Sequence, residues 1–241
     1  MAAAQRPGCA RENAGQQSRL APTAQPLTPL HQGAGLQEPR LSEVLRYLGH
    51  KSQAIDPQLM ATIQDTCAQA AAAIRPRWVW RVFPLRKEEA LACSGNVTAT
   101  RFLVEGTSLV LDGLSMEVLL EGASAIALMA VTCGPGPDLA WQRTHETQPT
   151  QALVYNACAI EIVECAANAA NRQIDDWARG QGFSATKRYS PGYGDLPLSV
   201  QPALLNALDA QNTLGITLTP ELWMVPQKSV TALVGLKETD N

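Results

Sequence analysis

The sequence predicts a single α+β domain built around an antiparallel sheet. Its 241 residues are enough for one sizeable core, since a domain usually takes roughly 100 to 200 residues. Short apolar runs typical of strands are mixed with pairs of amphipathic helices, without the strict strand-helix-strand alternation of a parallel sheet. The sequence also has no internal repeat, which disfavours a solenoid.

Composition and charge exclude several classes of protein. Hydrophobic residues make up 46% and charged residues 17%, as in packed globular proteins. The formal net charge of -3 supplies no broad positive field for phosphates, so no nucleic acid partner is expected. The longest apolar stretch, Ala123 to Cys133, is about half of what a membrane-spanning helix needs, so no membrane segment is expected. The amino terminus lacks the apolar region of a secretory signal, which favours a cytoplasmic location.

The cysteines are interpreted as reduced thiols, mostly small core residues, of a cytoplasmic protein. They form no CxxC pair and no spacing with histidine that would suggest zinc. The histidines His31, His50 and His145 are far apart in the sequence, so neither a metal site nor a histidine-based catalytic site is expected. The six cysteines are Cys9, Cys67, Cys93, Cys133, Cys158 and Cys165.

Residues 1–38 are predicted to form a flexible low-complexity tail, followed by one domain over residues 39–241. The tail is rich in Ala, Gln, Pro and Gly and has no sustained helical or strand period. Such a segment cannot bury enough apolar area to offset the entropy cost of ordering. Its composition is compatible with a targeting segment, a tether or a mis-assigned translation start.

Two helices are expected next. From Leu41 to Leu48 the apolar residues follow the i, i+3, i+4, i+7 spacing of a short amphipathic helix, which ends at Gly49. Asp56 and Pro57 are a favourable N-cap and first residue for a second helix, which Pro76 ends.

Strands are predicted where aromatic and β-branched residues gather. Trp78 to Phe83 is one, and Arg101 to Leu111 is a hairpin that turns at Gly106. Because Trp78 and Trp80 alternate along the first strand, core packing is expected for at least one, with solvent or a partner facing the other.

The middle of the chain is predicted to be mainly helical. Leu114 to Leu120 has a helical pattern, whereas the apolar run Ala125 to Val131 fits a buried strand or a helix, with strand favoured. Residues 138–179 are Ala-rich and interrupted only by Pro149, which predicts two helices, the second being the longest element.

The carboxyl-terminal part is expected to contain a stiff loop, a helix and closing strands. The helix is predicted from Ser199 to Gln211. Short apolar runs predict strands at Leu214 to Leu218, Leu222 to Val225 and Val230 to Leu236. Lys228 and Ser229, just before the last strand, are interpreted as an edge-strand feature at least as readily as a ligand contact.

The most informative segment is KRYSPGYGDLPLSVQ, at residues 187–201. Proline fixes φ and glycine permits positive φ, so Pro191-Gly192 is expected to form a tight turn beside Arg188 and Tyr193. Such a loop is able to hold a small polar ligand, although one loop of this composition is more often a stiff connection.

Arg188, three residues, and then Gly192-Tyr193 resembles the RxxxGY signature of the S-adenosylmethionine-binding activation domain of cobalamin-dependent methionine synthase. Other blocks are similar to stand-alone members of that family, and together they cover residues 41–237. They are EVLRYLGHK (43–51), RPRWVWRVFPL (75–85), SPGYGDLPL (190–198), LGITLT (214–219) and MVPQKSVTALVGL (224–236).

The resemblance implies a single C-shaped domain with a bent antiparallel sheet flanked by helices. It further implies a reactivation module for a separate cobalamin-dependent methionine synthase or related corrinoid protein in methionine biosynthesis. In that family an inactive cob(II)alamin on the partner is restored by one electron from a flavodoxin-like donor and a methyl group from S-adenosylmethionine. The module itself contributes proximity and orientation, as an accessory subunit without catalytic residues of its own.

The resemblance also implies how this chain holds S-adenosylmethionine. Arg188 pairs with the ligand carboxylate, and Gly192 and Tyr193 present backbone polar groups to the methionine or adenine portions. Glu164 is the match for an acidic residue that faces an ammonium or sulfonium charge, with Glu161 as the alternative. The implied cofactor-binding residues are Arg188, Ser190, Pro191, Gly192, Tyr193 and Glu164.

A second function stays open. An acidic contact near the start of the family's domain has no counterpart here, and Asp195 follows the Gly-Tyr pair, where its charge would repel a carboxylate. The alternative is therefore a non-catalytic docking or chaperone module for a corrinoid protein. A hydrolase or an independent methyltransferase is disfavoured, because the chain has neither a nucleophile elbow nor a Rossmann glycine loop.

Overall fold

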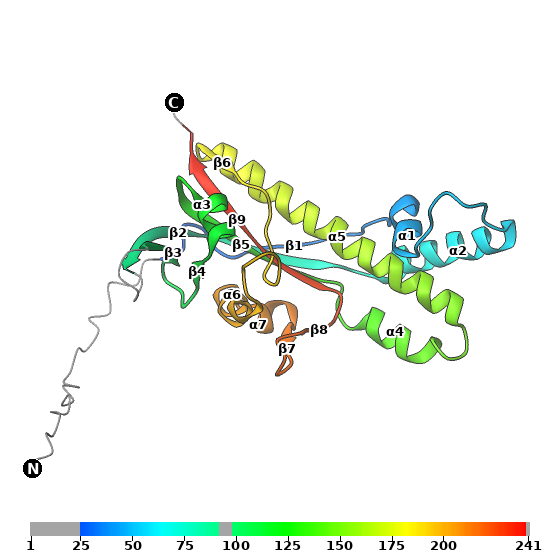
Figure 1. Cartoon of the computed structure of the whole chain (residues 1–241). Helices are drawn as coiled ribbons and strands as arrows, with labels where there is room; N and C mark the ends of the chain where they lie inside the picture. Colours follow the sequence, from blue (N-terminus) through cyan, green and yellow to red (C-terminus); the bar gives the residue numbers. More distant parts are fainter. Residues whose placement is uncertain (1–24, 92–97, 240–241) are drawn as a thin grey trace, which may run out of the picture.

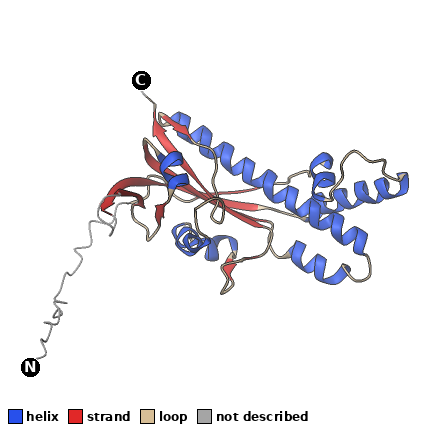
Figure 2. Cartoon of the chain, in the orientation of Figure 1, coloured by secondary structure: helices blue, strands red, loops and turns tan. Residues whose placement is uncertain are grey.

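The computed structural model describes residues 25–91 and 98–239. These residues form an α+β fold with a bent antiparallel sheet flanked by helices, as the sequence predicts (Figures 1 and 2). Within them the main sheet has seven strands, in the order β4-β3-β2-β5-β9-β6, with β1 added beside β2. Strands far apart in the sequence therefore become neighbours at the centre.

The strand β2 (Arg77–Leu91) links the two halves of the sheet. Its first part, up to Pro84, pairs with β5 (Ala123–Thr132), and its second part, from Leu85, pairs with β3 (Thr98–Val104). Proline has no N–H to donate to a ladder, so Pro84 suits the point where the strand changes partners. The hairpin from β3 to β4 (Val110–Asp112) turns at Gly106, as predicted.

The central strands are buried on both faces. In β5 the last eight residues are all buried, as are six consecutive residues in the middle of β9 (Ser229–Glu238). Alternate side chains of β5 enter two separate cores: Met129 packs on one face and Leu128 on the other. This double burial explains why the run from Ala123 to Cys133 is continuously apolar rather than alternating.

The long helix α5 (Pro149–Gly180) covers one face of the sheet and packs against α2 (Pro57–Ala73), α1 (Leu41–Tyr47) and α4 (Gly136–Thr144) (Figure 1). Small buried residues such as Ala166 and Ala170 let it lie close to the strands. Among the described residues, α5 has the length and hydropathy of a membrane span. More than half of its apolar window is nevertheless buried in the fold, as in the core helix of a globular domain.

The other face carries shorter elements. They are α3 (Leu114–Leu120), the 3-10 turn η1 (Leu198–Val200), α6 (Gln201–Ala207), α7 (Ala210–Leu214) and the hairpin of β7 (Thr217–Leu218) with β8 (Met224–Val225). Leucines from α3, α6 and α7 fill the second core together with Phe83 and Leu128. The strand β6 (Phe183–Ala185) pairs with the end of β9.

The described part of the amino-terminal segment differs from the expected tail. Residues 1–24 lie outside the described residues, but β1 (His31–Ala34) pairs with β2. Leu27 N–H donates to the Val82 carbonyl over 2.8 Å, and the Thr28 side chain is buried. The backbone of β2 supplies the hydrogen bonds here, so this segment needs little apolar surface of its own. A search for periodicity cannot detect such a strand.

Two further expectations are corrected. The helix predicted from Ser199 to Gln211 begins as the 3-10 turn η1, continues as α6 and ends before α7. Asp209 separates α6 from α7 because it adopts a left-handed conformation. Trp78 and Trp80 lie on the same face of β2 and both are buried, since residues two apart on a strand point the same way. Both indole N–H groups donate to Gln173 Oε1, at 3.0 and 3.1 Å.

Candidate functional site

The segment after β6 is fixed along the edge of β9. Thr186 N–H donates to the Gly235 carbonyl, and Tyr189 exchanges two backbone hydrogen bonds with Leu233, at 2.8 and 2.9 Å. The Tyr189 side chain packs on the second core. Extended residues alternate in direction, so Arg188 points the opposite way, to the face covered by α5.

Arg188, on the segment after β6, forms an ion pair with Glu164 of α5. Arg188 Nη2 donates to Glu164 Oε2 over 2.8 Å, although the residues are 24 positions apart. The side chains are 22% and 35% exposed, so the pair is partly shielded from water. Arg188 Nη1 is buried and has no hydrogen-bond partner in the described part of the chain. A buried donor without a partner costs free energy, which makes this guanidinium edge a candidate for binding an anionic ligand group.

The loop that follows is closed by its own backbone. Gly192 N–H donates to the Leu196 carbonyl over 2.9 Å, and Tyr193 N–H donates to the Ser190 carbonyl over 3.3 Å. The Tyr193 carbonyl accepts from Leu196 N–H and from the Tyr189 hydroxyl. Gly192 has φ +87°, which favours glycine. The amides of Gly192 and Tyr193 are thus occupied inside the loop, and shaping the loop is the role that the structure supports for them.

A cavity of about 250 Å³ lies between this loop, α5 and the β7–β8 hairpin. Four of the predicted site residues line it: Glu164, Ser190, Pro191 and Tyr193. Arg188 and Gly192 are not lining residues, and Arg188 is connected to the cavity by its hydrogen bond to Glu164. The volume is just below the roughly 300 to 1,000 Å³ of most small-molecule sites, so a ligand of ordinary size would be only partly enclosed.

The polar floor of the cavity was not predicted from the sequence. Thr231 Oγ1 donates to Gln201 Oε1 over 2.9 Å, and Ser229 Oγ donates to the Pro226 carbonyl over 2.7 Å. Ser229 and Thr231 belong to the part of β9 that β6 does not pair with, since β6 pairs only with Leu236 to Glu238. Ser229 is therefore both an edge residue and a cavity residue. Leu222, Trp223 and Met224 form a further wall.

Asp195 does not line the cavity. Its carboxylate accepts from Ser115 N–H, at 3.1 and 3.3 Å, at the start of α3. The side chain and backbone of Ser115 hold the pKa of Asp195 below its usual value of 3.8. Gly113, the N-cap residue of α3, has no side chain that could accept a hydrogen bond. Asp195, from a loop distant in the sequence, takes this capping role. The expected repulsion of a ligand carboxylate has no geometric support.

We expect Asp195→Asn to lower thermal stability at neutral pH while keeping an oxygen acceptor. A carboxyl group with a lowered folded-state pKa stabilises the fold above its ordinary pKa of 3.8, and this contribution is lost as the pH falls through the lowered value. The melting temperatures of wild type and variant should therefore converge in acid. Asp65→Asn, at an exposed position of α2, is the control. A difference in melting temperature that is constant with pH contradicts the cap.

Glu161, the alternative to Glu164, occupies a different environment. Its side chain is 1% exposed, and its Oε1 accepts from Arg40 Nε over 2.7 Å. Cys165 Sγ also donates to this oxygen, and burial raises the pKa of that thiol to about 11. Glu161 is not part of the cavity lining, so the structure favours Glu164 as the acidic residue of the candidate site.

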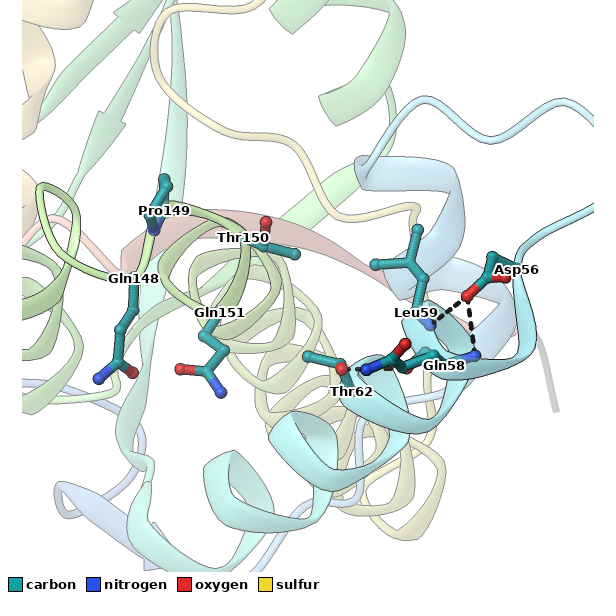
Figure 3. A pocket seen from close by; sticks show the side chains of 8 residues that line it. All are labelled: Asp56, Gln58, Leu59, Thr62, Gln148, Pro149, Thr150 and Gln151. Carbon is teal, nitrogen blue, oxygen red and sulfur yellow. Dashed lines mark hydrogen bonds between the residues drawn. The ribbon is translucent and has the colours of Figure 1, made fainter.

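A larger hollow of about 470 Å³ lies where the amino-terminal ends of α2 and α5 meet (Figure 3). Its lining is mostly neutral, with Gln58, Gln148 and Gln151 around it. The one carboxylate, of Asp56, is occupied in capping α2 through the amides of Gln58 and Leu59. This hollow offers no converging charged groups and lies apart from the predicted site residues.

No protein-family model matches the sequence, and no curated protein sequence matches it significantly. Among solved structures, the chain is similar to the crystal structure of the MetH reactivation domain bound to AdoHcy. The TM-score is 0.61 at 17% sequence identity, over 95% of this chain and 84% of that one. The chain therefore has the fold of that reactivation domain, which confirms the fold expected from the resemblance.

Proposed function

We propose that this chain is an S-adenosylmethionine-binding reactivation module that acts on a cobalamin carried by a partner protein. The observation that supports this most directly is the Arg188–Glu164 pair beside the cavity, on a fold shared with the MetH reactivation domain. That relative was solved bound to AdoHcy. S-adenosylmethionine supplies an activated methyl group, and the partner's cobalamin accepts it.

The two charged residues suit the amino-acid end of such a ligand. Arg188 Nη1 is a buried donor without a partner in the described part of the chain, and a ligand carboxylate that reaches it would supply the missing acceptor. The carboxylate of Glu164, which lines the cavity, would face an ammonium or sulfonium group. A guanidinium holds a carboxylate through two parallel hydrogen bonds, which lysine does not reproduce. Because one edge of the guanidinium is fixed by Glu164, its orientation is set before the ligand arrives.

The small volume of the cavity also fits this role. A methyl group that leaves for another protein must stay accessible, so a fully enclosed site would prevent the transfer. Ser190, Pro191 and Tyr193 lie on a loop held by its own hydrogen bonds, which positions the ligand without covering it. This chain's contribution is then binding and orientation, as an accessory subunit.

The partner in this proposal is a cobalamin-bearing methionine synthase or a related corrinoid protein, with a flavodoxin-like protein as electron donor. The setting is the cytoplasm. In the described part of the chain, Cys67, Cys133, Cys158 and Cys165 are free thiols, as in proteins of reducing compartments, whereas Cys9 and Cys93 lie outside the described residues. Burial raises the pKa of Cys133 to about 12, which keeps this thiol unreactive.

The experiment is a reactivation assay with a methionine synthase that lacks its own reactivation domain and carries oxidised cobalamin. With S-adenosylmethionine and a reductant, adding this chain should restore methylated cobalamin, followed by its absorbance. No change in absorbance across several corrinoid partners would argue against the proposal.

A docking module without ligand is the second candidate. The observation that favours it is the same ion pair, because Arg188 and Glu164 can also serve to attach the loop to α5. It predicts that the chain binds the corrinoid partner equally well with and without S-adenosylmethionine. Tighter partner binding with the ligand present would exclude it.

A further inference from the structure

Two exposed aromatic side chains border the cavity. Tyr193 is 70% exposed and Trp223 is 69% exposed, and both belong to the lining. Large rings are usually buried, because they contribute much apolar area to a core. The two residues come from separate segments, the loop after β6 and the hairpin of β7 and β8, which approach each other below the sheet in Figure 1.

Hydrogen bonds to Thr219 fix the backbone of the turn that carries Trp223. Thr219 N–H donates to the Trp223 carbonyl over 2.9 Å, and Trp223 N–H donates to Thr219 Oγ1 over 3.3 Å. Between them, Leu222 has φ +67°, a conformation that residues with a side chain rarely adopt. A strained residue that holds a tryptophan out in solvent has no benefit for packing, and such strain is often found where a ligand binds.

Neither ring has an aromatic partner in the described part of the chain. The stacked or edge-on pairs among the described residues join other rings, such as Trp80 with Trp177 and Trp141 with His145. The faces of Tyr193 and Trp223 are therefore open to a flat molecule. Flat rings stack on aromatic side chains through dispersion and complementary charge distributions.

The charge distribution of the lining decides which part of a ligand lies at these rings. Glu164, with Arg188 behind it, attracts the charged amino-acid end. Apolar lining residues flank the rings in the sequence: Leu222 and Met224 on either side of Trp223, and Pro191 two residues before Tyr193. A neutral planar group is what this part of the cavity would accept.

We infer that Trp223, together with Tyr193, forms a stacking surface for the purine ring of the S-adenosyl ligand. The inference rests on the proposed function and adds a specificity-determining residue to it. Trp223 selects ligands that carry a purine, whereas Arg188 and Glu164 select the amino-acid end.

The test is calorimetric titration of the full chain with S-adenosylhomocysteine and S-adenosylmethionine. Trp223→Ala should weaken both ligands about tenfold, the usual effect of removing a stacked aromatic side chain. Trp223→Phe should retain most of the affinity. Trp141→Ala, at a half-exposed tryptophan of α4, is the matched control and should bind as wild type does. Circular dichroism melts verify that each variant is folded.

The outcomes separate the two proposals. No binding of either ligand to wild type overturns the proposed function and the stacking surface together. Wild-type binding with an unchanged affinity in Trp223→Ala overturns the stacking surface alone. A loss confined to S-adenosylmethionine would mean that Trp223 faces the cationic sulfonium and not the purine, which also contradicts the inference.

Discussion

Arg188→Ala is expected to weaken S-adenosylmethionine binding by about 30-fold or more. Removing one partner of a shielded, hydrogen-bonded charge pair costs about 2 kcal/mol or more, and each 1.4 kcal/mol is tenfold in affinity. The fold should persist, since the Glu164 side chain left behind is 35% exposed and can be hydrated. Calorimetry measures the affinity, and a thermal melt measures the stability.

Two variants control this experiment. Arg179→Ala removes an exposed arginine of α5 that pairs with Asp176, and it should leave ligand affinity unchanged. Arg188→Lys keeps the positive charge but lacks the planar guanidinium with its paired N–H donors. Its affinity for the ligand should therefore lie between those of Arg188→Ala and the wild type. Wild-type affinity in Arg188→Ala would show that this guanidinium does not contact the ligand. The docking-module alternative predicts a different result, in which the wild type itself does not bind S-adenosylmethionine.

Glu164→Gln is expected to weaken both S-adenosylmethionine and S-adenosylhomocysteine by about tenfold or more. The amide keeps an oxygen for Arg188 but removes the negative charge, and a hydrogen bond to a charged group contributes roughly 1.5 to 3 kcal/mol. Both ligands carry the ammonium group, so both should respond. Calorimetry at two salt concentrations measures the effect and how far it is screened.

Asp176→Asn, at an exposed position of the same helix, is the control for the loss of one negative charge. If the negative charge acted only through the long-range electrostatic field of the protein, Asp176→Asn and Glu164→Gln would weaken ligand binding equally. A direct contact between Glu164 and the ligand requires a much larger loss of affinity in Glu164→Gln. Equal losses would mean that Glu164 acts only through the net charge of the protein.

Much of the fold could be predicted because local signals and tertiary structure agree. Asp56 caps α2 through the amides of Gln58 and Leu59, as its place before Pro57 predicts. The helix α3 has the predicted bounds, and Pro149 separates α4 from α5. In each case the signal lies within a few residues of the feature that it specifies.

The secondary-structure predictions are wrong where residues far away in the sequence determine the local conformation. The strand β1 has too little apolar surface to be recognised, and it exists because β2 offers backbone hydrogen bonds. The break between α6 and α7 depends on a left-handed Asp209, a conformation that tertiary packing has to select. The strands predicted around β7 and β8 are only two residues each, since the chain turns back at Thr219.

The candidate site was predicted in part. The loop at residues 188–193 and Glu164 could be identified by resemblance, and the fold brings Arg188 to 2.8 Å from Glu164. The cavity wall from the β7–β8 hairpin and the polar floor of Gln201 and Thr231 could not be identified from the sequence. These residues belong to no motif, and only the tertiary fold brings them together. The clearest signal available was Trp223, an aromatic residue in the short connection that begins at Pro220.

A crystal structure of this chain with S-adenosylhomocysteine tests the proposed binding site. We expect ligand density in the cavity between Glu164 and Tyr193, with the ligand carboxylate on Arg188. Ordered ligand at the hollow beside Asp56, or elsewhere on the surface with the cavity empty, would contradict it.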